Sequence, residues 1–284
     1  MKPIIRPLAL AAALFSLTAC VTAPKYQGPP TNSAPIAYKI AALPSPAIGP
    51  SAKPRIGGPP LSTPDQFRRY LDKNESVLYF QNYGGGGVAL GLLAGPLGVL
   101  ANAKMIEGVT AADAAALRGK LDVDVRGRFS AALGAHPAFV DGENGALFSP
   151  YLLVEKIDDE HMKFASMLSV DLSPSGKTWS RRYIYELPDT YTKTQLSSGL
   201  TAEQVQMIAS HFEIGMNWNL ATLEKETRGE LKPGKQQQAH SEFVTPRITV
   251  AQIAYRFDSE PGRAAFVSGD AIYSLDEASV RFTN

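Results

Sequence analysis

Ten prolines between Val21 and Thr63 rule out a continuous helix in that stretch of the chain. Ala, Ser and Gly fill most of the space between the prolines, so few apolar side chains are available for burial. This composition predicts an extended, largely polyproline-like tether with a reach of up to ~100 Å. Residues 36–43 (IAYKIAAL) are the exception, because they are apolar enough to add a strand to a neighbouring domain.

The residues that precede this tether have the features of an export signal. Lys2 and Arg6 supply positive charge, and residues 8–17 form an apolar run. The run is about ten residues long, roughly half of what a membrane-spanning helix needs. It ends in the sequence LTAC, whose last residue, Cys20, is the one cysteine of the chain. The alternative interpretation is an ordinary signal peptide with a chance cysteine.

The LTAC sequence that ends at Cys20 resembles the lipobox of bacterial lipoproteins. In that family the cysteine thiol takes a diacylglycerol, the signal is removed and the new amino terminus is acylated. The resemblance implies that residues 1–19 are a lipoprotein signal peptide and that residues 20–63 are a lipidated Pro/Ala-rich linker. Several acyl chains on Cys20 would then hold the chain firmly in a membrane. Val21 stands where an inner-membrane retention signal usually carries Asp, which implies the outer membrane.

Composition limits the kinds of protein that this chain can be. An exported protein works in an oxidising compartment, where disulfides are available. With its one cysteine assigned to lipid, this chain must draw its stability from core burial instead. About 220 residues lie beyond position 63, enough for one large domain or two small ones. The 28 basic and 27 acidic residues give a net charge of +1, so we expect no nucleic-acid partner.

The folded domain is expected at residues 64–284, and its first half mixes helix and strand signals. A capping box that begins at Thr63 predicts a helix start. Residues 76–83 (SVLYFQNY) are aromatic and β-branched, which predicts a strand. Apolar residues recur every four positions over residues 110–133 and predict a helix. The rival interpretation is a strand over residues 121–125 (LDVDV), where apolar and acidic residues alternate.

Strand signals dominate the middle of the domain. Residues 151–157 and 164–172 have the pattern of a hairpin joined by the acidic turn 158–160. Residues 177–187 predict a further strand. On that strand four bulky side chains share one face: Trp179, Arg181, Tyr183 and Tyr185.

A second long helix and a group of short strands complete the domain. A capping box that starts at Thr201 predicts the helix. Five apolar residues form its inward side: Val205, Ile208, Phe212, Met216 and Leu223. Residues 235–239 are polar and indicate a loop. Residues 248–257 and 264–282 predict short strands, with a hairpin turn at Gly269.

The order of these elements predicts an α+β fold, with two main helices packed on one face of an antiparallel sheet. In element order alone the domain resembles small α+β domains of bacterial envelope lipoproteins and transport-associated periplasmic proteins. That resemblance rests on no motif and assigns no residues.

Residues 84–103 form an uncharged, glycine-rich segment. Its glycines at Gly87, Gly91 and Gly95 would line one stripe of a helix and allow another helix to approach closely. Three interpretations remain open: a buried hairpin or loop, a membrane-dipping or self-associating element, and a mobile loop. The start of the segment also fits G-x-G-x-x-A, but four consecutive glycines satisfy many patterns, so we expect no cofactor.

The remaining chemistry-bearing residues form no recognisable motif. The four histidines are dispersed, without HExxH spacing, so we expect neither metal nor catalytic residues. The sequence therefore favours a non-catalytic, outer-membrane-anchored lipoprotein that faces the periplasm and binds an envelope partner or self-assembles into a homo-oligomer. The alternatives are a small-molecule or lipid-binding auxiliary of an envelope transport system and a lipid-anchored hydrolase.

Overall fold

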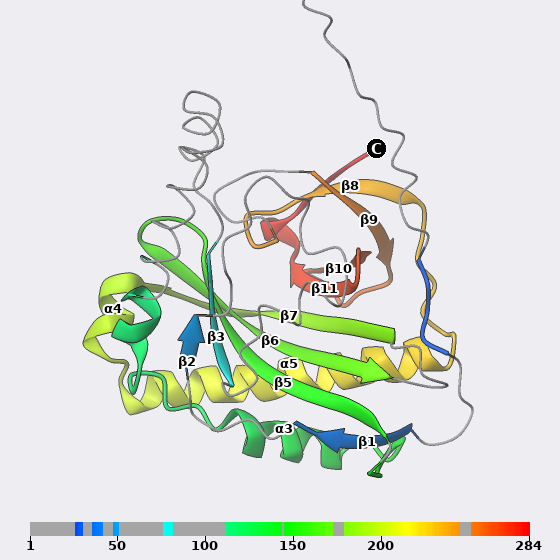
Figure 1. The fold of residues 1–284 in the computed structure, drawn as a ribbon. Helices are drawn as coiled ribbons and strands as arrows, with labels where there is room; N and C mark the ends of the chain where they lie inside the picture. Colours follow the sequence, from blue (N-terminus) through cyan, green and yellow to red (C-terminus); the bar gives the residue numbers. More distant parts are fainter. Residues whose placement is uncertain are drawn as a thin grey trace, which may run out of the picture.

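The structure, a computed structural model, describes residues 26–30, 36–41, 48–50, 76–81, 109, 112–143, 145–172, 179–244 and 251–284. Cys20 and the three spaced glycines, Gly87, Gly91 and Gly95, lie outside the described residues. The described strands belong to one 12-stranded sheet, which helices accompany (Figure 1). The α+β class predicted from the sequence is confirmed, but the sheet is mixed rather than antiparallel throughout.

Three long antiparallel strands form the centre of the sheet: β5 (Ala146–Lys156), β6 (His161–Leu172) and β7 (Trp179–Thr192). The hairpin expected over residues 151–172 is therefore confirmed, with longer arms. Its acidic turn is closed by Asp158, whose Oδ1 accepts the backbone N–H groups of Glu160 at 2.7 Å and His161 at 2.6 Å. Short polar side chains favour turns because they can accept backbone hydrogen bonds in this way.

The N-terminal strands break the antiparallel pattern. They are β1 (Ile36–Ile40), β2 (Ile48–Pro50), β3 (Val77–Gln81) and β4 (Phe139–Asp141). Both β1 and β3 run parallel to β5, and β1 also runs parallel to β4. Strands that reach a sheet through long connections are not forced to be antiparallel by a hairpin turn. The strand expected within residues 36–43 is present, so the proline-rich stretch contributes directly to the sheet.

The C-terminal strands form a meander that stands on the opposite side of β5–β7 from the long helix (Figure 1). Its strands in sequence order are β8 (Gln236–His240), β9 (Gln252–Phe257), β10 (Arg263–Ser268) and β11 (Ala271–Asp276), and β12 (Arg281–Thr283) returns to pair with β8. Their link to the centre is parallel pairing of β11 with β7. The hairpin turn expected at Gly269 is confirmed, with Ser268 paired to Ala271 and a φ of 59° at Gly269.

The polar loop expected at residues 235–239 is wrong, because β8 occupies that position. Its backbone pairs with β9 on one side and β12 on the other. Of its side chains only Ala239 is buried, so the three glutamines that precede it remain at least partly in contact with solvent. A strand held by backbone pairing on both sides tolerates such a polar sequence.

The single helix expected over residues 110–133 is also wrong. Helical residues cover positions 112–117, and a new helix, α3 (Val125–Gly134), starts only after a non-helical connection. Gly119 adopts a φ of 69°, which stops the first helix, and the Asp124 carboxylate caps α3 by accepting the Gly127 N–H at 2.9 Å. The rival strand over residues 121–125 does not form either.

The second long helix is confirmed as α5 (Ala202–Thr227), with the capping box between Thr201 and Gln204. Arg228 is its C-cap residue and is followed by Gly229 at a φ of 68°. A shorter helix, α4 (Lys193–Ser198), precedes it. In the layer below the sheet in Figure 1, α5 contacts β6 and β7, whereas α3 contacts β5 and α5.

Both faces of the central strands are buried, because the sheet lies between two apolar cores. The core on the helix side includes Phe129, Phe148, Phe164, Phe212 and Met216. The core on the other side lies beneath the C-terminal meander and includes Leu78, Tyr151, Met167, Ile184 and Phe266. On the outward side of α5, Met207 and Ile214 remain exposed.

Candidate binding site

An open cleft of about 650 Å³ lies between α5 and the turn that connects β9 to β10. From α5 and the end of α3 it is lined by His136, Ile214, Asn217, Trp218, Ala221, Thr222 and Lys225. Tyr185 of β7 and the turn residues Asp258, Ser259 and Glu260 complete the lining. The cleft thus joins the outward side of the long helix to the C-terminal meander.

The floor of this cleft is aromatic. Trp218 of α5 and Tyr185 of β7 meet with ring centroids 5.8 Å apart and a tilt of 49°. The guanidinium of Arg263 lies 3.9 Å from the centroid of the Tyr185 ring, a cation–π contact that fixes the orientation of this ring. Ile214 stands one helical turn before Trp218 and is 56% exposed, so its aliphatic side chain is open to solvent at the cleft.

Charges of both signs surround the aromatic floor. Asp258 and Glu260 contribute carboxylates from the turn, and Lys225 contributes an ammonium group from α5. His136 Nδ1 lies 3.6 Å from Glu224 Oε2, so this imidazole already has an acidic neighbour. An apolar floor with charged edges can hold an amphipathic group and orient it by polar contacts.

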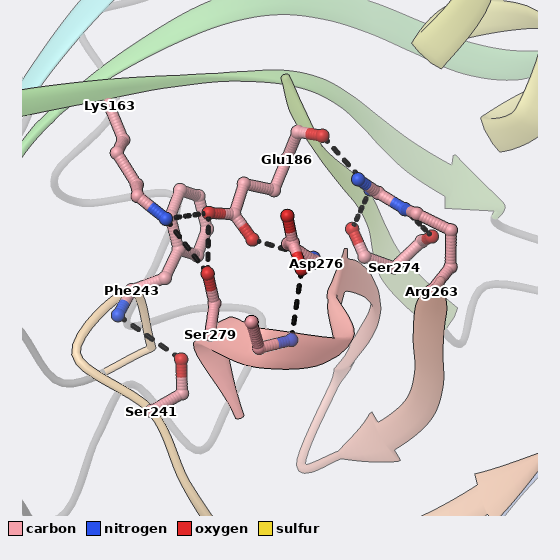
Figure 2. A network of polar contacts seen from close by, with 9 residues as sticks. Lys163, Glu186, Ser241, Phe243, Arg263, Ser274, Asp276 and Ser279 are labelled. Atoms are coloured by element: carbon pink, nitrogen blue, oxygen red, sulfur yellow. Dashed lines mark hydrogen bonds and ion pairs between the residues drawn. The ribbon is translucent and has the colours of Figure 1, made fainter. Parts of the chain in front are cut away.

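A second polar cluster ties the C-terminal meander to the central strands (Figure 2). Its centre is the buried Glu186 carboxylate, which forms an ion pair with Lys163. The same carboxylate accepts the Ser279 hydroxyl at 3.2 Å and the Asp276 N–H at 2.9 Å. Arg263 donates to the Glu186 backbone oxygen at 2.9 Å. Because these partners come from four different elements, we interpret this cluster as structural.

Glu155 lies beside this cluster, at the position of β5 that pairs with Lys163 of β6. Burial, and then the nearby Glu186 carboxylate, raise the pKa of Glu155 well above its usual range. Burial at this position therefore shifts the carboxyl group toward its neutral form, whereas the nearby Lys163 acts in the opposite direction.

The third polar cluster joins the start of the described chain to the end of α5. We call it the N-terminal clasp, formed by Tyr26, Arg181, Tyr183 and Glu226. The Glu226 side chain is completely buried, and its Oε1 lies 3.1 Å from Arg181 Nη2. Tyr26 donates its hydroxyl to Glu226 Oε1 at 2.8 Å, and Tyr183 donates to Oε2. Burial, and then the charge of Glu226, raise the pKa of both tyrosines, so both phenols remain protonated donors.

Arg181 also holds the chain next to Tyr26. Its guanidinium lies 5.4 Å from the Tyr26 ring centroid and 5.3 Å from that of Trp179. Its Nη2 donates to the backbone oxygen of Gln27 at 2.6 Å, and Pro29 is buried. The first described residues of the proline-rich stretch are thus bound to the domain by hydrogen bonds, a cation–π contact and burial.

All four histidines have a polar neighbour. His211 Nδ1 lies 2.6 Å from Asp189 Oδ2, and His161 Nδ1 lies 2.8 Å from Asp158 Oδ2. His240 Nε2 lies 3.3 Å from the Thr283 hydroxyl. Within the described ranges, no three His, Cys, Asp or Glu side chains gather into a group that could hold a metal ion.

Sequence reasoning missed both the cleft and the clasp. The signal for the clasp was present, because Arg181 shares one face of a predicted strand with the aromatic residues Trp179, Tyr183 and Tyr185. A buried arginine needs a carboxylate, and Glu226 lies three positions after Leu223 on the inward side of α5. The cleft had no such signal, since it depends on where the β9–β10 turn meets the helix.

No protein-family model, curated protein or solved structure matches this chain. In the part of the chain that the structure describes, no helix is both long and apolar enough to cross a membrane.

Proposed function

We propose that this chain is a bacterial lipoprotein, anchored through Cys20 in the outer membrane, that presents a non-catalytic binding domain to the periplasm. The observation that carries the proposal is the order of features in residues 1–20: positive charge, apolar run, small residues and then the one cysteine. No disulfide is needed in this proposal, because two apolar cores stabilise the domain.

The cleft is the proposed binding surface. In this proposal α3 and α5 form the helical layer on one face of the sheet, and the outward side of α5 remains for a partner. Ile214 and Trp218 would bury an apolar side chain of the partner. Asp258 and Glu260 would form ion pairs with a flanking basic group of the partner. A polypeptide segment with adjacent apolar and basic residues is therefore the best fit.

A small amphipathic molecule is the second candidate ligand. Its support is the size of the cleft, about 650 Å³, within the range of about 300–1,000 Å³ that is common for small-molecule sites. In that case the protein would act as a ligand-binding auxiliary of an envelope transport system.

The anchor is tested by replacing Cys20 with serine in cells fed a fatty-acid probe. The parent chain, with Cys20 intact, should take the label and partition with membranes. The Cys20→Ser variant should do neither. Labelling of the serine variant would reject the lipoprotein proposal.

The cleft is tested by crosslinking in intact envelopes, with Ile214→Glu compared against Met207→Glu. Both residues are exposed on α5, at 56% and 42%, but only Ile214 lines the cleft. A polypeptide partner at the cleft predicts that crosslinked species disappear with Ile214→Glu and persist with Met207→Glu. Equal crosslinking in both variants would reject the cleft as the protein-binding surface and leave the small-molecule candidate.

A further inference from the structure

The N-terminal clasp lies very close in sequence to the proposed lipid anchor. Tyr26 follows Cys20 by six positions, and an extended chain covers at most about 3.6 Å per residue. The Tyr26 backbone therefore lies within about 20 Å of the backbone of the anchored residue. A free tether up to Thr63 would instead allow the domain to move as far as ~100 Å away.

From this geometry we propose that the N-terminal clasp holds the domain directly against the membrane, with the α5 C-terminal end and the start of β7 facing the lipid surface. This inference rests on the proposed lipidation of Cys20. The chain from Cys20 to Tyr26, at the beginning of the proline-rich stretch, then acts as a short strap. The whole stretch does not act as a spacer between the lipid and the domain.

The contacts of the N-terminal clasp are buried, so releasing Tyr26 from them is unfavourable. Its acceptor, Glu226, is completely buried, and the Arg181 side chain beside it is only 5% exposed. Detaching Tyr26 would remove its hydrogen bond to the buried Glu226 carboxylate, a type of bond that is stronger than one between neutral groups. It would also remove the cation–π contact with Arg181 and the bond from Arg181 to the Gln27 backbone oxygen.

The surface next to the clasp carries exposed basic groups. Arg228, Lys232 and Lys235 follow one another in the loop that comes after Glu226 and the end of α5. Glu224 pairs with Arg228, and Glu230 offsets a further part of this charge. The remaining positive charge is suited to phosphate groups at a lipid surface.

Trp179 is a fluorescent reporter at the N-terminal clasp, because the Arg181 guanidinium lies over its ring. Trp218 is the only other tryptophan of the chain. We would place the lipidated full chain carrying Trp218→Phe in phosphatidylcholine–phosphatidylglycerol vesicles that contain a dansyl-labelled phospholipid. Energy transfer from Trp179 to the lipid reports the distance of the clasp from the membrane. Vesicles without the acceptor correct for changes in the fluorescence of Trp179 itself.

Two variants lengthen the strap in different ways. Tyr26→Ala releases the clasp, so that the next segment held by strand pairing starts at Ile36, sixteen positions from Cys20. An insertion of about ten Gly/Ser residues after Thr22 leaves the clasp intact but adds roughly 15–20 Å of flexible reach. Both should lose most of the energy transfer while they still pellet with the vesicles.

The matched control is Tyr255→Phe, which removes a phenol hydroxyl that donates to Gln236 in the C-terminal meander and leaves every residue of the clasp in place. It should retain the transfer of the parent. Unchanged transfer in the vesicle-bound Tyr26→Ala and insertion variants would overturn the inference while the lipid anchor stands. A parent that neither takes a fatty-acid label nor pellets with vesicles would reject the anchor itself, and the membrane placement with it.

Discussion

Gly215 of α5 lies so close to Ser166 of β6 that a β-carbon at position 215 would stand 2.2 Å from the Ser166 hydroxyl oxygen. The same β-carbon would also stand 3.0 Å from Cδ1 of Tyr185. Gly215→Ala should therefore push α5 away from the sheet, and overpacking of this kind costs about 1–3 kcal/mol. Chemical denaturation should show this loss in the free energy of unfolding.

The control is Gly134→Ala in the last turn of α3, where a β-carbon would meet nothing within 4 Å. Alanine has the higher helix propensity, so this variant should be as stable as the parent or slightly more stable. Equal unfolding free energies for both variants would show that α5 does not pack against β6 as closely as described.

The sequence predicted those elements whose local signals agree with their packing. The capping box at Thr201 and the apolar positions that follow it led to α5, because the pattern of a helix is local. The alternating residues 121–125 show the limit of such reasoning. Leu121, Val123 and Val125 are buried, yet no strand forms, because the first two lie in an irregular connection and Val125 is the first residue of α3. Alternating apolar and acidic residues indicate that one side of a segment is buried, but a strand also needs another strand with which its backbone can pair.

Contacts between distant parts of the chain could not be predicted in the same way. Proline content correctly excluded helix from the stretch around Tyr26, but it gave no indication that this tyrosine binds Glu226, 200 positions away. Likewise β8 has a polar sequence and became a strand only because β9 and β12 pair with its backbone. Both features depend on partners that a local pattern does not contain.

Breaking the ion pair of the N-terminal clasp should destabilise the domain strongly. Glu226→Ala leaves the guanidinium of Arg181 buried without its carboxylate, and removing one partner of such a pair costs about 3–5 kcal/mol. Tyr183→Phe, which removes one hydroxyl from the same carboxylate, should cost only about 1.5–3 kcal/mol. Equilibrium denaturation of the two variants measures the difference.

A double replacement distinguishes the charge from the packing. Arg181→Met combined with Glu226→Leu removes both charges and keeps much of the buried volume, so it should recover most of the stability lost in Glu226→Ala. No recovery would mean that the contacts of Arg181 with Tyr26 and Trp179 matter more than the ion pair.

Glu155 should make the domain less stable as pH rises. Burial and the Glu186 carboxylate raise its pKa in the folded state above the 4.5 of an exposed glutamate, so between the two values the folded state binds the additional proton. Stability contributed by a raised carboxyl pKa is present at low pH and is lost as pH rises through the folded pKa. Glu155→Gln cannot ionise and should escape this loss.

The measurement is the difference in unfolding free energy between Glu155→Gln and the parent as a function of pH. The advantage of the glutamine variant should grow as pH rises above about 4.5 and level off above the folded pKa. A constant difference across this range would show that Glu155 ionises in the folded protein as it does in the unfolded chain.

The glycine series at Gly87, Gly91 and Gly95 provides a direct test of self-assembly, one form of the proposed function. If the series forms a close helix contact, Gly91→Leu places a large side chain where another backbone should lie, and self-association should be lost. If the segment is instead core, the same change overpacks the interior and should cost about 1–3 kcal/mol. Sedimentation and thermal melting of the same samples separate the two outcomes.

Ala89→Leu is the control, because position 89 would lie on the opposite side of a helix from the glycine stripe. Unchanged association of Gly91→Leu together with a lowered melting temperature would exclude assembly through this segment.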